Sequence, residues 1–468
     1  QNRLRNPLHP PLLHLHTTKT RRRNRRRTHA NRSPNPTTPR RVGAVSSIRL
    51  RYLAEINPST ASFDRCSDLA EICFMPLETV WADQRLDTTR RRVKADVATG
   101  YVRFQSGDIL CPKVTPTFQA GRSAIMANIP RGFGAATTEV HVVRSKPDRS
   151  DPRFVRYALL SKRFLEEGVS RFQGVAGLQR VPDSYLRDFH VKNEPLEEQR
   201  RIADFLDDQV TRIDQAIQLR QQQIDLVHEH QASYLRDTTT VWRGKSKPTG
   251  VAWMPKIRES WRLSRIGLVF TTGSGSTPPS DDRTLYGGPH PWLLTGDLND
   301  GLVIETKNTL SDKALMRFGT LAPYPSGSLV VAMYGATIGR LGILGAPASV
   351  NQACCVLTRQ TVVQTRFAFY WFLGHRQEIL QLGTGAGQPN ISQELVRSLL
   401  IPVAPWSDQK CAISDMESSS DAAGRIIHSM NDAVRLLMER KRSLITAAVT
   451  GEFDVSSASS RAAGLVGV

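Results

Sequence analysis

The chain has 468 residues, of which 40% are hydrophobic, so it is long enough for two to four domains with buried cores. No apolar run is long enough for a membrane-spanning helix. The six cysteines show neither a zinc spacing nor a disulfide framework, so a reducing, cytoplasmic setting is expected. The formal charge of +20 is compatible with binding to phosphate groups but is not diagnostic of it.

Residues 1–45 hold twelve Lys or Arg and no Asp or Glu. Their Pro, Asn, Thr and Arg content, without hydrophobic periodicity, predicts a disordered segment. The basic run at 21–27 is typical of a nucleic-acid-binding arm. The alternative is translated upstream sequence, because the chain begins with Gln rather than Met.

An internal repeat follows this segment. RFVRYALLSKR at 153–163 aligns with RFAFYWFLGHR at 366–376, an offset of 213 that also aligns Arg49-Leu50 with Arg262-Leu263. Further along, an offset of 210 aligns Pro195 with Pro405 and Gln199 with Gln409. The repeat predicts a chain built as two similar halves.

Each half ends in a stretch, 193–240 or 403–453, in which apolar residues recur with heptad spacing. This spacing predicts a long helix whose apolar stripe packs against a partner helix. The two stripes share the 210-residue offset. The predicted apolar seam is Leu206, Val210, Ile213, Ile217, Ile224 and Val227 in the first helix and Ile413, Met416, Ile427, Met430, Val434, Leu437 and Leu444 in the second. Polar seam positions are Arg220, Gln231, Ser420 and Lys441, which could set the register. The alternative is two separate amphipathic helices, each packed on its own domain.

Segments 46–192 and 261–402 mix strand and helix signals and are predicted as two α/β (α+β) domains. Turns entering strands are expected at 107–110 and 327–331, and helices at 152–166 and 365–380. Gly and Pro at 241–260 predict a linker, and 454–468 a loose tail.

Four segments resemble the specificity (S) subunits of type I restriction–modification systems. PLEEQRRIADFLDDQVTRIDQAI (195–217) is similar to the start of that family's first spacer helix, and LITAAVTGEFDV (444–455) to the end of its second. GDILCPKVTPTFQAGRSA (107–124) and GSLVVAMYGATIGRLGILGAPASVNQACCVL (327–357) resemble its two target-recognition domains. The helix entry PWSDQKCAISDMESSSDAA is more polar than is usual in the family, and TTTVWRGK ends the first helix where something closer to TAAVTRG is common.

The resemblance implies a division of labour. Two target-recognition domains would each read half of a split site in double-stranded DNA. Two long antiparallel coiled-coil helices, related by a pseudo-two-fold axis, would fix the gap. The helices would also dock two methyltransferase (M) subunits. S-adenosylmethionine, ATP and magnesium would be bound by those subunits and by restriction/translocase (R) subunits, with no cofactor in this chain.

No catalytic residues and no metal site are predicted. Gly273-Ser-Gly-Ser-Thr277 lacks the Lys-Ser/Thr ending of a phosphate-binding loop and is expected to be a flexible loop. No adenine-methyltransferase motif, dinucleotide fingerprint or His-Glu-x-x-His pattern is present. The competing interpretations are a self-sufficient methylating or cleaving enzyme and a non-catalytic helical adaptor or DNA-binding module without type I partners.

Residue types that read bases or hold phosphates give the candidate DNA contacts. They are Arg90, Arg91, Arg92, Lys94, Lys113, Thr115, Arg122 and Thr138 in the first domain and Tyr334, Thr337, Arg340, Asn351, Gln352, Gln388 and Asn390 in the second. Arg90 to Lys94 would be a phosphate clamp, with a solvated basic face as the alternative. The Gly-flanked loop 334–340 would approach DNA closely. Its alternative is a tight packing turn, with Asn351 capping a strand end.

Overall fold

The computed structural model describes residues 46–80, 86–174, 179–358, 360, 362–383, 390–453 and 455. The described residues from Ser47 onward belong to one compact unit. The basic segment 1–45 and the tail 456–468 lie outside the described residues.

The first domain has two four-stranded sheets, ordered β2-β9-β6-β7 and β4-β3-β8-β5, and a short β1-β10 ribbon. Val142 and Val143 of β9 are both fully buried, because the two faces of this strand pack against different apolar clusters. The strands are β1 (Ser47–Arg49), β2 (Ala54–Ile56), β3 (Glu71–Met75), β4 (Arg91–Val93), β5 (Val102–Gln105), β6 (Ile109–Pro112), β7 (Ala124–Ile125), β8 (Phe133–Ala136), β9 (Val140–Ser145) and β10 (His190–Lys192). The helices are α1 (Ala61–Asp64), α2 (Pro152–Leu160), α3 (Lys162–Ser170) and α4 (Asp183–Asp188).

The second domain has a five-stranded sheet, β14-β21-β18-β19-β16, a three-stranded sheet, β17-β15-β20, and the ribbons β13-β22 and β11-β12. Its strands are β11 (Ser246–Val251), β12 (Met254–Arg258), β13 (Arg262–Arg265), β14 (Thr271–Ser274), β15 (Tyr286–Leu293), β16 (Gly301–Val303), β17 (Asn308–Leu310), β18 (Leu329–Ala332), β19 (Leu341–Leu344), β20 (Ser349–Val350), β21 (Cys354–Thr358) and β22 (Leu400–Val403). The helices are α6 (Ile266–Val269), α7 (Asp312–Arg317), α8 (Thr365–Gly374), α9 (Arg376–Gln381) and α10 (Gln393–Ser398).

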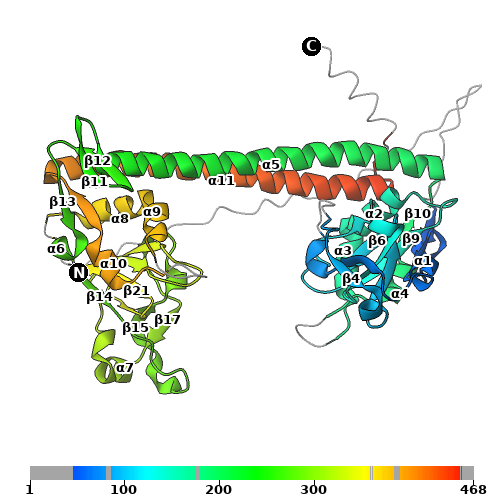
Figure 1. The fold of residues 1–468 in the computed structure, drawn as a ribbon, viewed down its shortest axis with the longest axis horizontal. Helices are drawn as coiled ribbons and strands as arrows, with labels where there is room; N and C mark the ends of the chain where they lie inside the picture. Colours follow the sequence, from blue (N-terminus) through cyan, green and yellow to red (C-terminus); the bar gives the residue numbers. More distant parts are fainter. Residues whose placement is uncertain are drawn as a thin grey trace, which may run out of the picture. The chain divides into compact units, whose positions relative to one another are not determined.

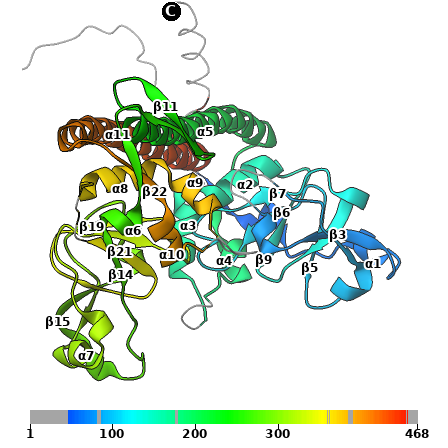
Figure 2. The same ribbon diagram turned by 60° about the vertical axis from the view of Figure 1, so that its left-hand side comes forward.

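Two 45-residue helices, α5 (Leu196–Thr240) and α11 (Trp406–Thr450), lie side by side in both views (Figures 1 and 2). Each begins directly after a proline, Pro195 or Pro405, because proline is tolerated at the start of a helix but disrupts its interior. Gln231 Nε2 donates to Ser420 Oγ at 2.9 Å, and Lys441 Nζ donates to both carboxylate oxygens of Asp214 at 2.7 Å. A later residue of α5 thus meets an earlier one of α11, so the helices are antiparallel.

Each domain packs on both long helices. Phe154 and Tyr157 of α2 lie in one apolar cluster with the start of α5 and the end of α11. Phe367 of α8 lies in another cluster that contains Leu235, near the end of α5, and Ile413, near the start of α11. The mixed α+β fold with two long antiparallel helices is therefore confirmed.

The structure differs from the sequence expectations at the start of the repeat and in the linker. Leu50 N donates to Phe189 O and Ile266 N to Leu399 O, so Ile266 rather than Leu263 is the structural equivalent of Leu50. The 213-residue offset is therefore wrong at this strand by three residues, because the connections between repeats differ in length. The predicted linker 241–260 contains the β11-β12 hairpin, and Met254 is buried in the core.

The two predicted domain helices are each interrupted. The stretch 152–166 is divided at Ser161, whose hydroxyl accepts from Phe164 N and begins α3. The stretch 365–380 is divided at His375, between α8 and α9. The helix before the break has 9 residues in α2 and 10 residues in α8. The two halves of the chain therefore share the break as well as the helix.

Candidate nucleic-acid interface

In the first domain, three loops far apart in sequence are joined through Lys113. Its backbone N–H donates to Glu139 O at 3.0 Å, and its carbonyl accepts from Val181 N at 2.9 Å. These bonds bring together residues 113–122, 137–139 and 179–181, named here the first loop cluster. The strands β6 and β9 supply two of the loops from neighbouring positions in one sheet.

The second domain repeats this arrangement around Met333. Its N–H donates to Ala353 O at 2.8 Å, and its carbonyl accepts from Ile391 N at 2.8 Å. The second loop cluster is therefore residues 333–340, 351–353 and 390–391, supplied by the neighbouring strands β18 and β21. The backbone frame of the two clusters is the same, whereas Lys113 is replaced by Met333 and Glu139 by Ala353.

The first cluster carries three cations, Lys113, Arg122 and Arg180, and one carboxylate, Glu139. Glu139 Oε1 accepts from Arg180 at 2.9 Å, which raises the pKa of Arg180. Burial lowers the pKa of Lys113, while the nearby Glu139 carboxylate opposes that shift. Thr138 is exposed beside this group, and Thr115 and Arg122 are half-buried. The cluster thus presents polar side chains in a fixed arrangement, with an acidic group among the basic ones.

Side chains of the second cluster are more open to solvent. Tyr334 and Arg340 are exposed at the two ends of a tight loop. Gly335 (φ 84°) and Gly339 (φ 75°) take left-handed backbone conformations there, which favour glycine. Arg340 N donates to the carbonyl of the half-buried Thr337 at 3.0 Å. The loop is a tight turn that presents two large side chains to solvent, and its approach to DNA stays a prediction.

In the neighbouring loop, the two adjacent candidate DNA contacts Asn351 and Gln352 differ in exposure to solvent. Asn351 is half-buried, and its Oδ1 is buried without a hydrogen-bond partner in the described part of the chain. Gln352 and Asn390 are exposed. Gln388 lies outside the described residues. Gln352 and Asn390 are consequently better placed than Asn351 to meet a ligand in solvent.

The predicted phosphate clamp lies outside the first cluster and runs from the residue before β4 to the 3-10 helix Lys94–Val97 after it. Lys94 is only 7% exposed, and its Nζ donates to Cys66 O at 2.6 Å and pairs with Asp68 at 2.9 Å. Arg90 pairs with Glu78 at 3.0 Å, and the Arg92 guanidinium lies 4.6 Å from the Phe74 ring centroid. Arg91 is exposed, and its guanidinium donates to two nearby carbonyls. Lys94 is therefore a structural residue, since satisfying buried carbonyls removes it from contact with DNA.

None of the predicted apolar seam residues is exposed. Leu206, Val210, Ile213, Ile224, Ile413 and Met416 are buried, and Ile217, Val227, Ile427, Met430, Val434, Leu437 and Leu444 are half-buried. Of the polar seam positions, Gln231 pairs with Ser420 and Lys441 with Asp214. Arg220 is exposed and donates to Gln223 of its own helix, so it does not set the register.

The chain is similar in sequence to known proteins. A family model described as the type I restriction modification DNA specificity domain matches residues 258–422, which include the second loop cluster. The EcoAI type I restriction enzyme specificity subunit of Escherichia coli is 34% identical over 184 residues. That match covers 39% of this chain and 30% of the relative. The MjaX type I specificity subunit of Methanocaldococcus jannaschii is 22% identical over 394 residues, covering 81% of this chain and 87% of the relative.

The chain is therefore similar in sequence to type I restriction specificity subunits, with the family model covering residues 258–422. It spans about a third of the length of the Escherichia coli members that it matches. A chain from a solved type I R-M system shares the fold, with a TM-score of 0.67 at 14% identity, over 87% of this chain and 98% of that one.

The sequence interpretation missed a contribution from the loop 273–277 to the second loop cluster. Thr277 Oγ1 donates to Gln352 Oε1, and Ser274 Oγ donates to Gln352 O at 3.2 Å. A Cβ on Gly275 would lie 1.7 Å from Val350 O, so glycine allows the loop to pack against β20. The Gly-Ser pattern was the only available signal, and it is equally typical of a flexible loop. The structure instead makes this loop a support for Gln352.

Proposed function

We propose that this chain is the DNA-specificity subunit of a type I restriction–modification complex and reads a bipartite, asymmetric site in double-stranded DNA. The observation that carries the proposal is the pair of loop clusters. Each domain holds three loops with the same backbone bonds, but the side chains on the two frames differ. Because the backbone hydrogen bonds are the same, the two loop clusters can contact DNA in the same orientation. Because their side chains differ, each cluster can recognise a different half-site sequence.

The helix pair is proposed as the spacer between the half-sites. Each domain is packed on both helices, so the helices act as one rigid connection rather than as a tether. A rigid connection turns half-site spacing into a consequence of helix length. In the described part of the chain, no helix is both long and apolar enough to cross a membrane. We propose the cytoplasm, where DNA is found, as the place of action.

The same helices are proposed to dock two methyltransferase subunits. Leu226 of α5 is 63% exposed and Leu436 of α11 is 60% exposed. These leucines are 210 residues apart, so they occupy equivalent positions in the two halves. Leu219, one heptad before Leu226 on α5, is 61% exposed and extends this apolar surface. Exposed apolar patches on a protein surface are typical of interfaces. Two equivalent leucines suit two copies of one partner.

Methylation and cleavage are proposed to take place on partner subunits. S-adenosylmethionine, ATP and magnesium would be bound there, and the restriction subunits would join the same complex. The support is the absence of nucleotide-binding and methyl-transfer motifs from the printed sequence.

Selection from random duplex DNA tests the proposal. The full chain, purified with its cognate methyltransferase subunits, should enrich two short half-sites of different sequence separated by a gap of fixed length. Methyltransferase subunits without this chain are the control and should enrich nothing. A single uninterrupted motif would contradict the two-domain assignment, and no enrichment by the complex would favour an adaptor without sequence preference.

A further inference from the structure

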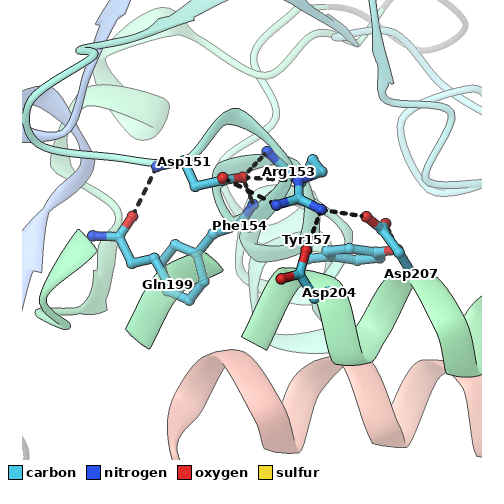
Figure 3. A network of polar contacts seen from close by, with 7 residues as sticks. All are labelled: Asp151, Arg153, Phe154, Tyr157, Gln199, Asp204 and Asp207. Carbon is cyan, nitrogen blue, oxygen red and sulfur yellow. Dashed lines mark hydrogen bonds and ion pairs between the residues drawn. The ribbon is translucent and has the colours of Figure 1, made fainter. Parts of the chain in front are cut away.

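A glutamine at the start of α5 is bonded only to backbone groups. Gln199 is fully buried, and its Oε1 accepts from Asp151 N at 3.1 Å (Figure 3). Its Nε2 donates to Arg149 O at 3.1 Å and to Glu194 O at 2.8 Å. One side chain therefore joins the first turn of α5, the residue before Pro195, and the turn that leads into α2 of the first domain.

Gln409 makes the same bonds at the start of α11. It is also fully buried, and its Oε1 accepts from Gln364 N at 2.7 Å. Its Nε2 donates to Val362 O at 2.7 Å and to Ala404 O at 2.8 Å. The partner residues differ in type between the halves, but the glutamine is the same. A primary amide offers one acceptor oxygen and two N–H donors, which is the set that these three backbone groups require.

These bonds are located where each domain meets the helix pair. Asp151 and Gln364 are the N-cap residues of α2 and α8, the helices that pack each domain on α5 and α11. Fixing the first residue of such a helix relative to the first turn of the long helix fixes the angle between them. The angle of the domain sets where its loop cluster points.

The two joints differ in their further support. In the first, the Arg153 guanidinium bonds to Asp204 at 2.6 Å and to Asp207 at 3.0 Å, and also pairs with Asp151 (Figure 3). Tyr157 Oη donates to Asp207 at 2.7 Å. In the second, Arg366 corresponds to Arg153 and pairs with Glu417, while Ser414 and Gln364 stand where the first joint has Asp204 and Asp151. The second joint therefore depends more on its glutamine.

We propose that Gln199 and Gln409 are positioning residues that lock the angle of each recognition domain and thereby set the tolerated gap between half-sites. This inference rests on the proposed function. Without the glutamine, a domain can tilt on the helix pair while its own core and loop cluster stay intact. The half-site sequences then remain the same, and the preference for one gap length weakens.

The test compares binding profiles over gap length. Gln199→Met and Gln409→Met keep similar side-chain length but remove all three hydrogen bonds. Dissociation constants are measured for duplexes that carry both selected half-sites with the optimal gap and with gaps one or two base pairs shorter or longer. The ratio between optimal and altered gaps should fall about fivefold or more in Gln409→Met and less in Gln199→Met. Gln215→Met, at an exposed position on α5, should keep the wild-type ratio.

Melting temperature separates positioning from stability. Equal weakening at every gap length, with an unchanged ratio and a lower melting temperature, would overturn the positioning role. If Gln409→Met does not fold, Gln409→Asn provides the comparison, because its neutral amide is one methylene too short to keep all three hydrogen bonds. A wild-type chain with no preferred gap would overturn the proposed function itself, whereas a wild-type preference retained in the variants overturns only this inference.

Discussion

At the scale of single residues, burial in the structure distinguishes candidate DNA contacts that residue type alone does not distinguish. Lys94 and Arg340 are both cations in candidate segments, yet Lys94 is buried against Cys66 O and Arg340 is exposed at the edge of the second loop cluster. Burying an unpaired ammonium is costly, so Lys94 needs its carbonyl and carboxylate partners. Arg340 has no comparable burial to satisfy and is the better candidate for a DNA contact.

Replacing Arg340 tests this distinction. Arg340→Ala should weaken binding about tenfold or more at the second half-site, because a good arginine contact to a base contributes about 1–3 kcal/mol of discrimination. The first half-site should be read as before. Arg265→Ala removes an exposed arginine on β13 of the same domain and should leave the motif unchanged. Binding assays with single-base variants of each half-site check both expectations. Uniform weakening across all sequences would indicate a phosphate contact instead.

At the scale of elements, the long helices were the most predictable part of the chain. Their heptads carry a periodic signal over about 40 residues, and no predicted apolar seam residue is exposed. The β11-β12 hairpin was missed because Gly and Pro in a short segment indicate a turn without showing what the turn connects. The convergence of loops around Lys113 and Met333 could not be predicted, since it depends on contacts between segments distant in sequence.

The helix faces give an element-scale prediction for the partner subunits. Leu226→Glu and Leu436→Glu should each weaken one of two methyltransferase sites by about tenfold or more, because burying a leucine stabilises by about 1.5–3 kcal/mol. The double variant should lose both subunits. Gln221→Glu, also exposed on α5, is the control for added charge. The mass of the assembled complex, measured by light scattering, gives the stoichiometry. Two subunits bound tightly to the double variant would place the docking surface elsewhere.

At the scale of the whole molecule, both domains are attached to both long helices, which constrains how the spacer can be altered. Lengthening α5 alone would pull one domain away from α11, because Leu235 and Ile413 belong to the same apolar cluster. Matched insertions are therefore required. Positions after Gln222 and Met430 lie midway between the contacts Asp214–Lys441 and Gln231–Ser420, where the insertions would face each other.

The most direct test of the account is to lengthen the pair of helices α5 and α11. Three idealised heptads inserted into both helices add about 32 Å at about 1.5 Å per residue. That length is close to one turn of DNA, about 34–36 Å, so the domains should still face the same side of the duplex. Binding to duplexes with increasing gaps should show an optimum about nine or ten base pairs longer, with both half-site sequences unchanged. An unchanged optimum in a protein that still binds would contradict the helix pair as the spacer, and altered half-sites would contradict recognition by the two domains.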